Sequence, residues 1–220
     1  MSERSSFSEI LKAENSHIWD AIYSNTFLNE IKDGSLPLHK FSYYLIQDYL
    51  YLEAFARSVA LALAKAPNSE ILESLAKRVM TPIERPLHRQ LMPLVGIDLQ
   101  DVKKAPLSPT TTAYSNHLLK VASFGSLGSI AASLLPCPWT YHELGEVIGR
   151  VDHPIYGLWS AVYVDGFLAE SVKAWKGLVD QCALQASAEE LSMMRDAFRT
   201  SSRYELGFWN MAYDCESWPV

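Results

Sequence analysis

Apolar residues recur at spacings of three and four through nearly the whole chain of 220 residues. This spacing places them on one face of an α-helix, whereas a half-buried strand needs strict alternation of apolar and polar residues. No sustained alternating run bounded by turn signals is present in the sequence. The pattern therefore predicts an all-α fold, and a hydrophobic content of 49% can fill the core of one domain spanning residues 1–220.

Glycine, proline and helix-capping residues divide this pattern into separate helices. The turn Asp33-Gly34-Ser35 ends the first helix, Pro67-Asn68-Ser69 separates the second from the third, and the segment Ser187-Ala188-Glu189-Glu190 fits a capping box for a long last helix. A looser segment, residues 95–109, precedes the fourth helix. The helices expected before the last one cover residues 7–31, 37–66, 69–94, 110–122, a stretch around LLPCPW that ends near 151, and 153–183.

The charge and the termini exclude several classes of partner. A formal net charge of -6 and no basic cluster longer than Lys103-Lys104 argue against binding to nucleic acid. The N-terminus MSERSSFSEILKAENSH carries charges where a signal peptide needs an apolar core, and no apolar run is long enough to span a membrane. We therefore expect a cytoplasmic protein without membrane contact.

Two carboxylates interrupt apolar stripes that should face the core. Asp48 falls midway along the stripe of the second expected helix, with Tyr51 three residues later, and Glu205 interrupts the stripe of the last helix. No lysine or arginine occupies these stripe positions, so neither carboxylate has an evident cationic partner. An unpaired buried charge costs several kcal/mol, which a cavity holding water or a polar ligand would relieve. The stripes consist of Phe41, Leu45, Asp48, Leu52, Phe55 and Val59, and of Leu191, Met194, Phe198, Ser202, Glu205, Phe208 and Ala212.

The stretch LLPCPW places Cys137 between two prolines in a segment that otherwise has a helical pattern. Each proline costs about 3 kcal/mol inside a helix. Either the helix is kinked and its freed carbonyls face a cavity, or a new helix begins at Pro138 and leaves Cys137 at its N-terminus, where the helix dipole favours the thiolate. Three cysteines without a C-x-x-C pair predict neither a disulfide framework nor a zinc site, so at least one thiol is free.

Each of these features also has a purely structural interpretation. A buried carboxylate is often half of an ion pair, an inward tyrosine usually fills core volume, and a free cysteine is a common small core residue. The combination is more informative, because Cys137 and Tyr141 share one stripe while Tyr114 and Tyr163 lie on apolar faces of other helices. We therefore expect these side chains to converge on one polar pocket in the core.

Five stretches of the sequence resemble the TenA, or thiaminase II, family. They are DGSLPLHKFSYYLIQDYLYLEAFAR (33–57), PTTTAYSNHLL (109–119), LLPCPWTYHELGE (134–146), HPIYGLWSAVY (153–163) and SSRYELGFWNMAY (201–213). The resemblance implies the haem-oxygenase-like helical bundle, a homotetramer, and hydrolysis of aminopyrimidines in thiamin salvage. The implied substrate is 4-amino-5-aminomethyl-2-methylpyrimidine, which is converted to the 5-hydroxymethyl compound and ammonia; cleavage of thiamin is a second activity of many members.

The same resemblance implies roles for individual residues. Cys137 matches the nucleophile of the family, Glu205 its acid/base carboxylate and Asp48 the carboxylate that binds the pyrimidine. The sequence departs from the family at Asn25-Thr26-Phe27, where members commonly read His-Pro-Phe. The residues that match the lining of the substrate pocket are Tyr51, Tyr114, Tyr141 and Tyr163, with Phe208 beside them.

These residue types suit the chemistry. A carboxylate can pair with an exocyclic amine and the adjacent ring nitrogen, while tyrosines stack on a flat ring. A thiolate that adds to the neighbouring ring carbon would break aromaticity and let the amine leave, with Glu205 protonating and deprotonating a ring nitrogen. Water would then add to the methylene before the thiolate departs, so the reaction needs no metal or organic cofactor.

Other functions are compatible with the same fold. A di-iron oxidase would draw on Glu84 and His88, spaced i to i+4, and on the pair His142-Glu143, but no histidine follows His153 to complete the ligand set. A haem site would need an axial histidine, for which His17 is available. A non-catalytic pyrimidine-binding or regulatory protein is the third alternative, although the acidic charge argues against direct DNA contact.

Overall fold

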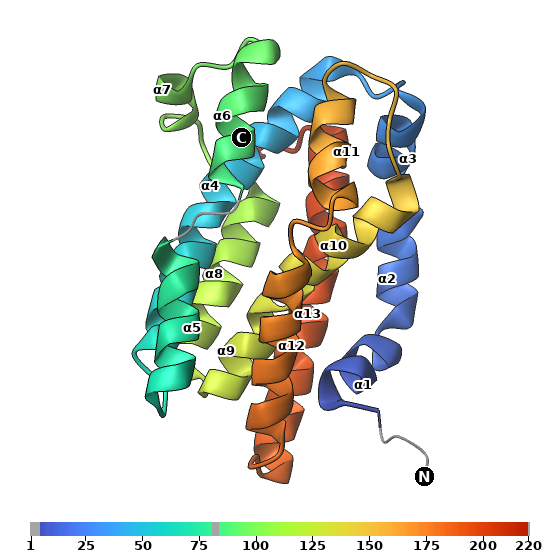
Figure 1. The fold of residues 1–220 in the computed structure, drawn as a ribbon. Coiled ribbons are helices and arrows are strands. Elements are labelled where there is room, and N and C mark those ends of the chain that lie inside the picture. The colour runs from blue at the N-terminus through green and yellow to red at the C-terminus, as the bar shows by residue number, and fades with distance from the viewer. Residues whose placement is uncertain (1–4, 81–83, 220) are drawn as a thin grey trace.

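The computed structural model describes residues 5–80 and 84–219, with only the backbone described at residues 79 and 80. All regular secondary structure in these ranges is helical (Figure 1), as the apolar spacing predicts. The helices are α1 (Phe7–Glu14), α2 (Ser16–Tyr23), α3 (Thr26–Asp33), α4 (Leu38–Leu63), α5 (Ser69–Met80), α6 (Arg85–Leu94), α7 (Leu99–Val102), α8 (Pro109–Phe124), α9 (Leu127–Leu134), α10 (Pro136–Ile148), α11 (Tyr156–Val164), α12 (Ala169–Ala183) and α13 (Ala188–Asp214).

The two long helices α4 and α13, of 26 and 27 residues, organise the bundle. They pack against each other, and both also pack against α8 and α9. The helices α2, α3 and α10 lie against α13, while α5 and α6 lie against α4. In Figure 1 the shorter α1 and α2 stand on one side of this centre and α5 stands on the other. Residues at the middle of α4 and α13 are therefore enclosed by helices from distant parts of the sequence.

The first expected helix, residues 7–31, consists of three helices instead. Asn15 ends α1, and its buried side-chain amide donates to the Leu11 carbonyl oxygen at 2.7 Å. Asn25 caps α3, where its side-chain oxygen accepts the Phe27 backbone N–H at 2.9 Å. Asparagine competes in this way for backbone hydrogen bonds within a helix. Asn25, at the position where the sequence departs from the family pattern, is thus a helix cap.

Two further expected helices are divided. The helix expected over 69–94 appears as α5 and α6, and the residues between them, 81–83, lie outside the described part. The stretch expected as one helix over 153–183 breaks after α11 at Gly166, whose φ of 72° lies in the left-handed region that favours glycine. The capping box is confirmed in part, since the Ser187 hydroxyl accepts the Glu190 N–H at 3.2 Å at the start of α13.

The prolines of LLPCPW begin a helix. α9 ends at Leu134 and α10 starts at Pro136, two residues earlier than the start expected at Pro138. Both prolines therefore lie in the first turn, where backbone N–H groups have no intrahelical partner, and their helix-breaking cost disappears. Cys137 lies in the same turn, and the Thr140 hydroxyl bonds the carbonyl oxygens of Pro136 and Cys137 at 3.0 and 3.1 Å.

A glycine allows α10 and α11 to approach each other closely. A Cβ added at Gly145 would lie 2.4 Å from the backbone oxygen of Tyr163. We expect Gly145→Ala to destabilise the protein by about 1–3 kcal/mol, because backbone must move to relieve the overlap. Thermal unfolding measures this loss. Gly177→Ala is the matched control, since its Cβ meets nothing within 4 Å on α12, and it should be neutral or stabilising. Equal unfolding temperatures for the two variants would contradict the prediction.

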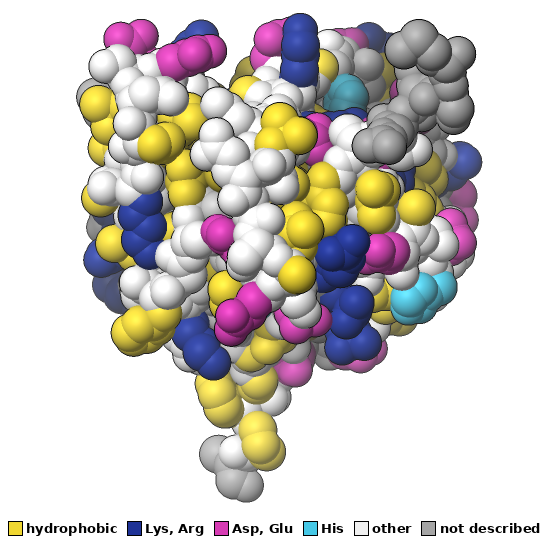
Figure 2. Space-filling view, turned by 90° about the horizontal axis from the view of Figure 1, so that it is seen from below, with side chains coloured by type: hydrophobic (Ala, Val, Ile, Leu, Met, Phe, Trp, Pro, Cys, Tyr) yellow, Lys and Arg dark blue, Asp and Glu magenta, His cyan; other side chains and the backbone are white. Residues whose placement is uncertain are grey.

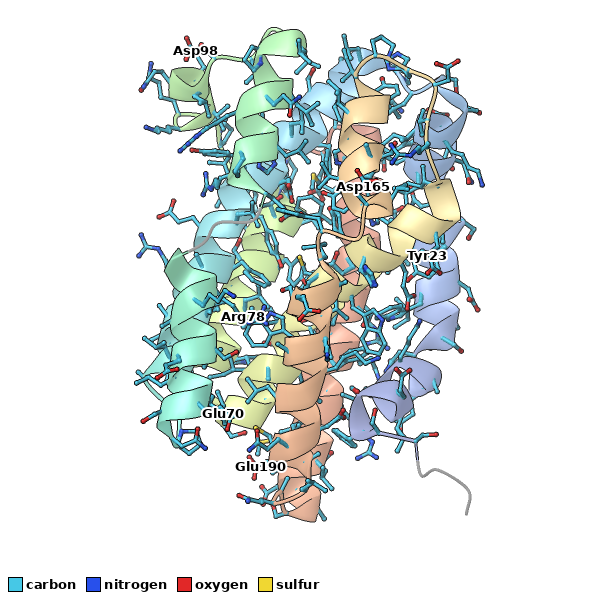
Figure 3. All side chains as sticks on the ribbon, viewed as in Figure 1. Tyr23, Glu70, Arg78, Asp98, Asp165 and Glu190 are labelled. Atoms are coloured by element: carbon cyan, nitrogen blue, oxygen red, sulfur yellow. The ribbon has the colours of Figure 1, made fainter. Side chains whose placement is uncertain are left out.

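The surface carries charges of both signs. Figure 2 shows lysine, arginine, aspartate and glutamate side chains interspersed on the face seen from below. Arg78, labelled in Figure 3, extends from α5 toward α12 and donates to the Ser171 hydroxyl at 2.6 Å. Within residues 5–80 and 84–219, no helix is long and apolar enough to cross a membrane.

Candidate active site

The polar residues picked out on the apolar stripes are buried in the centre of the bundle. Asp48 in α4 is 5% exposed, Cys137 in α10 is 8% exposed and Glu205 in α13 is 2% exposed. The predicted stripe of α13 is buried from Met194 to Ala212, with only Leu191 partly exposed. The three side chains interact electrostatically, because the carboxylates of Glu205 and Asp48 both act on the Cys137 thiol. The predicted convergence of these residues is therefore observed.

Glu205 is held by a tyrosine. The Tyr114 hydroxyl, from α8, donates to Glu205 Oε1 at 2.6 Å. Burial raises the pKa of Glu205 to about 8; the hydrogen bond from Tyr114 opposes this rise, and the negative charges of Asp48 and Glu84 add to it. Near neutral pH this side chain is therefore mostly a carboxylic acid, which can donate a proton.

Asp48 has a partner that the sequence analysis did not assign. His88 in α6 is 3% exposed, and its Nε2 lies 2.8 Å from Asp48 Oδ2. His88 Nδ1 is buried and has no hydrogen-bond partner among the described residues. The Nε2–Oδ2 hydrogen bond forms if Nε2 carries the proton and donates it to Asp48, which leaves Nδ1 as an unpaired acceptor. The expectation that Asp48 is unpartnered is wrong, because a distant helix supplies a histidine in place of a lysine or arginine.

Glu84 joins the cluster at its edge. This half-buried residue precedes α6, and its Oε1 accepts the Tyr163 hydroxyl at 3.2 Å. Burial raises the pKa of Glu84 to about 7, the charge of Asp48 adds to the rise, and His88 and the Tyr163 hydroxyl oppose it. The site thus brings together three carboxyl groups. Within the described part of the chain, none of them lies within salt-bridge distance of a lysine or arginine.

The environment of Cys137 favours the neutral thiol. Burial raises the pKa of the thiol well above its usual value, and the charges of Glu205, Glu84 and Asp48 add to this effect, while the Tyr51 hydroxyl opposes it. Its position in the first turn of α10 places it near the positive end of the helix dipole. The dipole favours the thiolate, whereas burial and the nearby carboxyl groups shift the pKa of Cys137 in the opposite direction.

Aromatic rings surround this polar cluster. The Tyr51 ring lies 4.8 Å from the Tyr114 ring and 5.7 Å from the Phe208 ring, and the Tyr141 ring lies 5.4 Å from the Tyr163 ring. The Tyr51 hydroxyl is buried near the Cys137 thiol, but no hydrogen bond of good geometry joins it to a described residue. A buried hydroxyl without a partner is costly and is free to bond a ligand. All the tyrosines expected to line a pocket therefore lie around Cys137 and the carboxyl groups.

The residues considered for metal or haem binding lie in different places. Glu143 receives hydrogen bonds from Lys12, Tyr23 and Trp139, and Tyr23 (Figure 3) reaches it from α2. His17 is exposed on α2. In residues 5–80 and 84–219, no three His, Cys, Asp or Glu side chains are arranged to hold a metal ion. The geometry gives no support to a di-iron or haem site built from these residues.

Glu84 and His88 are the site residues that sequence reasoning placed in a different site. Their i to i+4 spacing was visible, but it suggested metal ligands because nothing in the sequence links α6 to Asp48. Burial of a histidine between helices is a tertiary property, so only the structure reveals this pairing.

Comparison with known proteins decides the family. A sequence model of the TENA/THI-4/PQQC family matches residues 13–215. The chain belongs to this family. The aminopyrimidine aminohydrolase of Halalkalibacterium halodurans is 34% identical to it, over 97% of this chain and 98% of that protein. A TenA homologue from P. horikoshii OT3 superimposes with a TM-score of 0.86 at 27% identity, covering 96% of this chain and 99% of that one.

A more distant structure confirms the expected fold. A domain with a heme oxygenase-like fold from Shewanella denitrificans matches with a TM-score of 0.75 at 14% identity, over 97% of this chain and 94% of that chain. The all-α, haem-oxygenase-like architecture of the TenA family member is thus confirmed. Its aminopyrimidine aminohydrolase relatives, 28–34% identical over most of the chain, support a hydrolase that acts in thiamin salvage.

Proposed function

We propose that this protein hydrolyses 4-amino-5-aminomethyl-2-methylpyrimidine to the 5-hydroxymethyl pyrimidine and ammonia, with Cys137 as nucleophile and Glu205 as acid and base. The observation that carries the proposal is the burial of Cys137 in one aromatic cluster with Asp48 and the Glu205–Tyr114 pair. This arrangement offers a nucleophile, a proton donor and an anchoring carboxylate to one flat ring. Its relatives that are named aminopyrimidine aminohydrolases support the same reaction.

The polar and aromatic groups of the site suit an aminopyrimidine. Asp48, fixed by His88, would accept hydrogen bonds from the exocyclic 4-amino group, and a carboxylate held in this way discriminates strongly against a ring that lacks the amine. Tyr141 and Tyr163 would stack on the ring, and the free Tyr51 hydroxyl would bond a polar atom of the substrate.

The raised pKa values of Cys137 and Glu205 indicate how addition proceeds. The Glu205 carboxylic acid protonates a ring nitrogen as the sulfur bonds to the adjacent ring carbon, and the thiol proton replaces it on Glu205. The sulfur and the hydrogen of the thiol are thus added across one C=N bond, and no free thiolate is formed. The dihydropyrimidine then expels the amine from the exocyclic carbon, water adds there, and elimination of the thiol restores the aromatic ring.

The deciding experiment measures ammonia release from this substrate by purified, metal-stripped protein. Rapid release, with formation of the 5-hydroxymethyl pyrimidine in equal amount, would support the proposal. Folded protein that releases no ammonia would refute the proposal. Analysis of its metal content would then test the di-iron alternative, and a salt-dependent DNA-binding assay would test the regulatory alternative.

The proposal includes the assembly and location that the family resemblance implies. We propose that residues 1–220 form one catalytic domain that assembles into a cytoplasmic homotetramer without a cofactor. Light scattering on the purified protein tests the tetramer, and cell fractionation tests the location.

A further inference from the structure

Glu84 is the carboxyl group of the cluster to which the ring chemistry gives no task. In the proposed reaction Asp48 holds the amino edge of the pyrimidine and Glu205 exchanges a proton with a ring nitrogen. Glu84 accepts the Tyr163 hydroxyl and interacts electrostatically with Asp48 and His88, whereas Glu205 accepts the Tyr114 hydroxyl.

The position of Glu84 corresponds to one group of the substrate. The 5-aminomethyl group is bonded to the ring carbon next to the one that carries the 4-amino group. With Asp48 binding the 4-amino group as proposed, a carboxyl group beside Asp48 would lie close to the departing nitrogen. The hydrogen bond from the Tyr163 hydroxyl to Glu84 Oε1, 3.2 Å long, leaves Oε2 available.

We propose that Glu84 is the acid that protonates the departing amine and the base that then activates the attacking water. This inference rests on the proposed aminopyrimidine hydrolysis and assigns to Glu84 the step at the exocyclic carbon. It separates two proton transfers, one at the ring nitrogen by Glu205 and one at the leaving group by Glu84.

The step balances in protons and electrons. As the C–N bond breaks, its electron pair stays on nitrogen, the Glu84 proton moves to that nitrogen, and neutral ammonia leaves. The electron pair of the ring enamine forms the exocyclic C=C bond. Water then adds its oxygen to this methylene carbon and gives one proton to the Glu84 carboxylate, which restores the acid. The sum is amine plus water giving alcohol plus ammonia.

The surroundings of Glu84 keep a proton available for this step. Asp48 from α4, Tyr163 from α11 and His88 from α6 face it, and its charge acts in turn on Cys137 from α10. Burial and the charge of Asp48 outweigh His88 and the Tyr163 hydroxyl, so the pKa of Glu84 rises to about 7. A group with a pKa near the working pH can both donate and accept a proton efficiently.

The role of Glu84 as an acid can be tested with two substrates whose leaving groups differ in their need for a proton. Ammonia needs a proton as it leaves, whereas the thiazole of thiamin leaves as a neutral molecule from a quaternary nitrogen and needs none. We expect Glu84→Gln to slow ammonia release by at least about 100-fold and thiamin cleavage by a clearly smaller factor, because thiamin cleavage loses only the base that activates water. If wild-type cleavage of thiamin is too slow to measure, the 5-anilinomethyl pyrimidine replaces it, because aniline is a weak base that needs little protonation.

Glu205→Gln is the mechanistic control, because it impairs ring activation and should slow both reactions by the same factor. Glutamine at position 84 keeps the size of the side chain and can still accept the Tyr163 hydroxyl, and Glu84→Asp should recover part of the ammonia rate. Equal losses in both reactions for Glu84→Gln and Glu84→Asp, or no loss in either, would overturn the inference. A wild-type protein that releases no ammonia would instead refute the proposed function.

Discussion

Cys137→Ser is expected to reduce kcat/KM for ammonia release by at least about 10³-fold, because a buried serine hydroxyl adds to a ring carbon far less readily than a thiol. The substitution keeps the size of the side chain at a site that is 8% exposed, so the fold should be retained. Substrate affinity should change little, since the proposal assigns the binding contacts to Asp48 and the tyrosines. Steady-state kinetics and a binding titration separate the two effects.

The other thiols provide the matched control. Cys182→Ser changes a half-buried thiol on α12 that makes no contact with the proposed chemistry, and its activity should equal that of the wild type. Mass spectrometry of quenched wild-type protein should detect the pyrimidine bound to Cys137. Wild-type turnover by Cys137→Ser would exclude covalent catalysis.

Glu205→Gln is expected to lower turnover by about 10²- to 10⁴-fold, the usual contribution of a general acid or base. It should also remove one limb of the pH profile. The wild-type rate should fall as pH rises through about 8, because Glu205 then loses the proton that it donates. The variant has no titrating group at this position, so its low residual rate should lack the limb near pH 8 and keep only the fall that Glu84, with a pKa of about 7, imposes. A variant that keeps the same limb would show that another group controls it.

Glu205→Gln, which lowers activity, should raise the stability of the fold at alkaline pH. The pKa of Glu205 is about 8 in the folded protein and near its ordinary value of 4.5 in the unfolded chain, so the folded state binds the proton more tightly. The stabilising effect of this proton is complete below pH 4.5 and is lost as pH rises through 8. Each pKa unit corresponds to about 1.4 kcal/mol, so Glu205→Gln should be more stable than the wild type by a few kcal/mol at pH 9 and nearly equal to it at pH 4.

Thermal unfolding at both pH values measures this difference. Glu189→Gln, at an exposed position in the first turn of α13, is the control and should show no comparable gain at high pH. A variant less stable than the wild type at pH 9 would mean that Glu205 is stabilised by contacts that glutamine cannot replace.

The apolar stripes predicted most of the fold and the main polar residues of the site, but not the roles of Glu84 and His88. They identified the buried faces of α4, α10 and α13, because a helix buries residues at fixed spacing whatever its neighbours are. They failed where a single polar side chain decides the local backbone, as Asn15 does between α1 and α2. Asparagine occurs both inside helices and at their ends, so its position alone could not place this break.

The electrostatics of the site depend on tertiary structure in the same way. The sequence placed Cys137 at a helix N-terminus but could not weigh the helix dipole against burial and three nearby carboxyl groups. Nor could it pair His88 with Asp48, since the helices that carry them are 40 residues apart in the sequence at these positions. Sequence spacing therefore indicates which side chains point inward, whereas their charge state follows from which helices meet.

The burial of Cys137 also bears on how such an enzyme survives oxidants. Hydrogen peroxide and alkylating reagents attack the thiolate and reach exposed sulfur most readily. A thiol that is 8% exposed, with a pKa well above its usual range, presents little thiolate to either kind of reagent. In the proposed mechanism the thiol reacts only when a substrate ring accepts a proton from Glu205, so the resting protein would carry its nucleophile in an inert form.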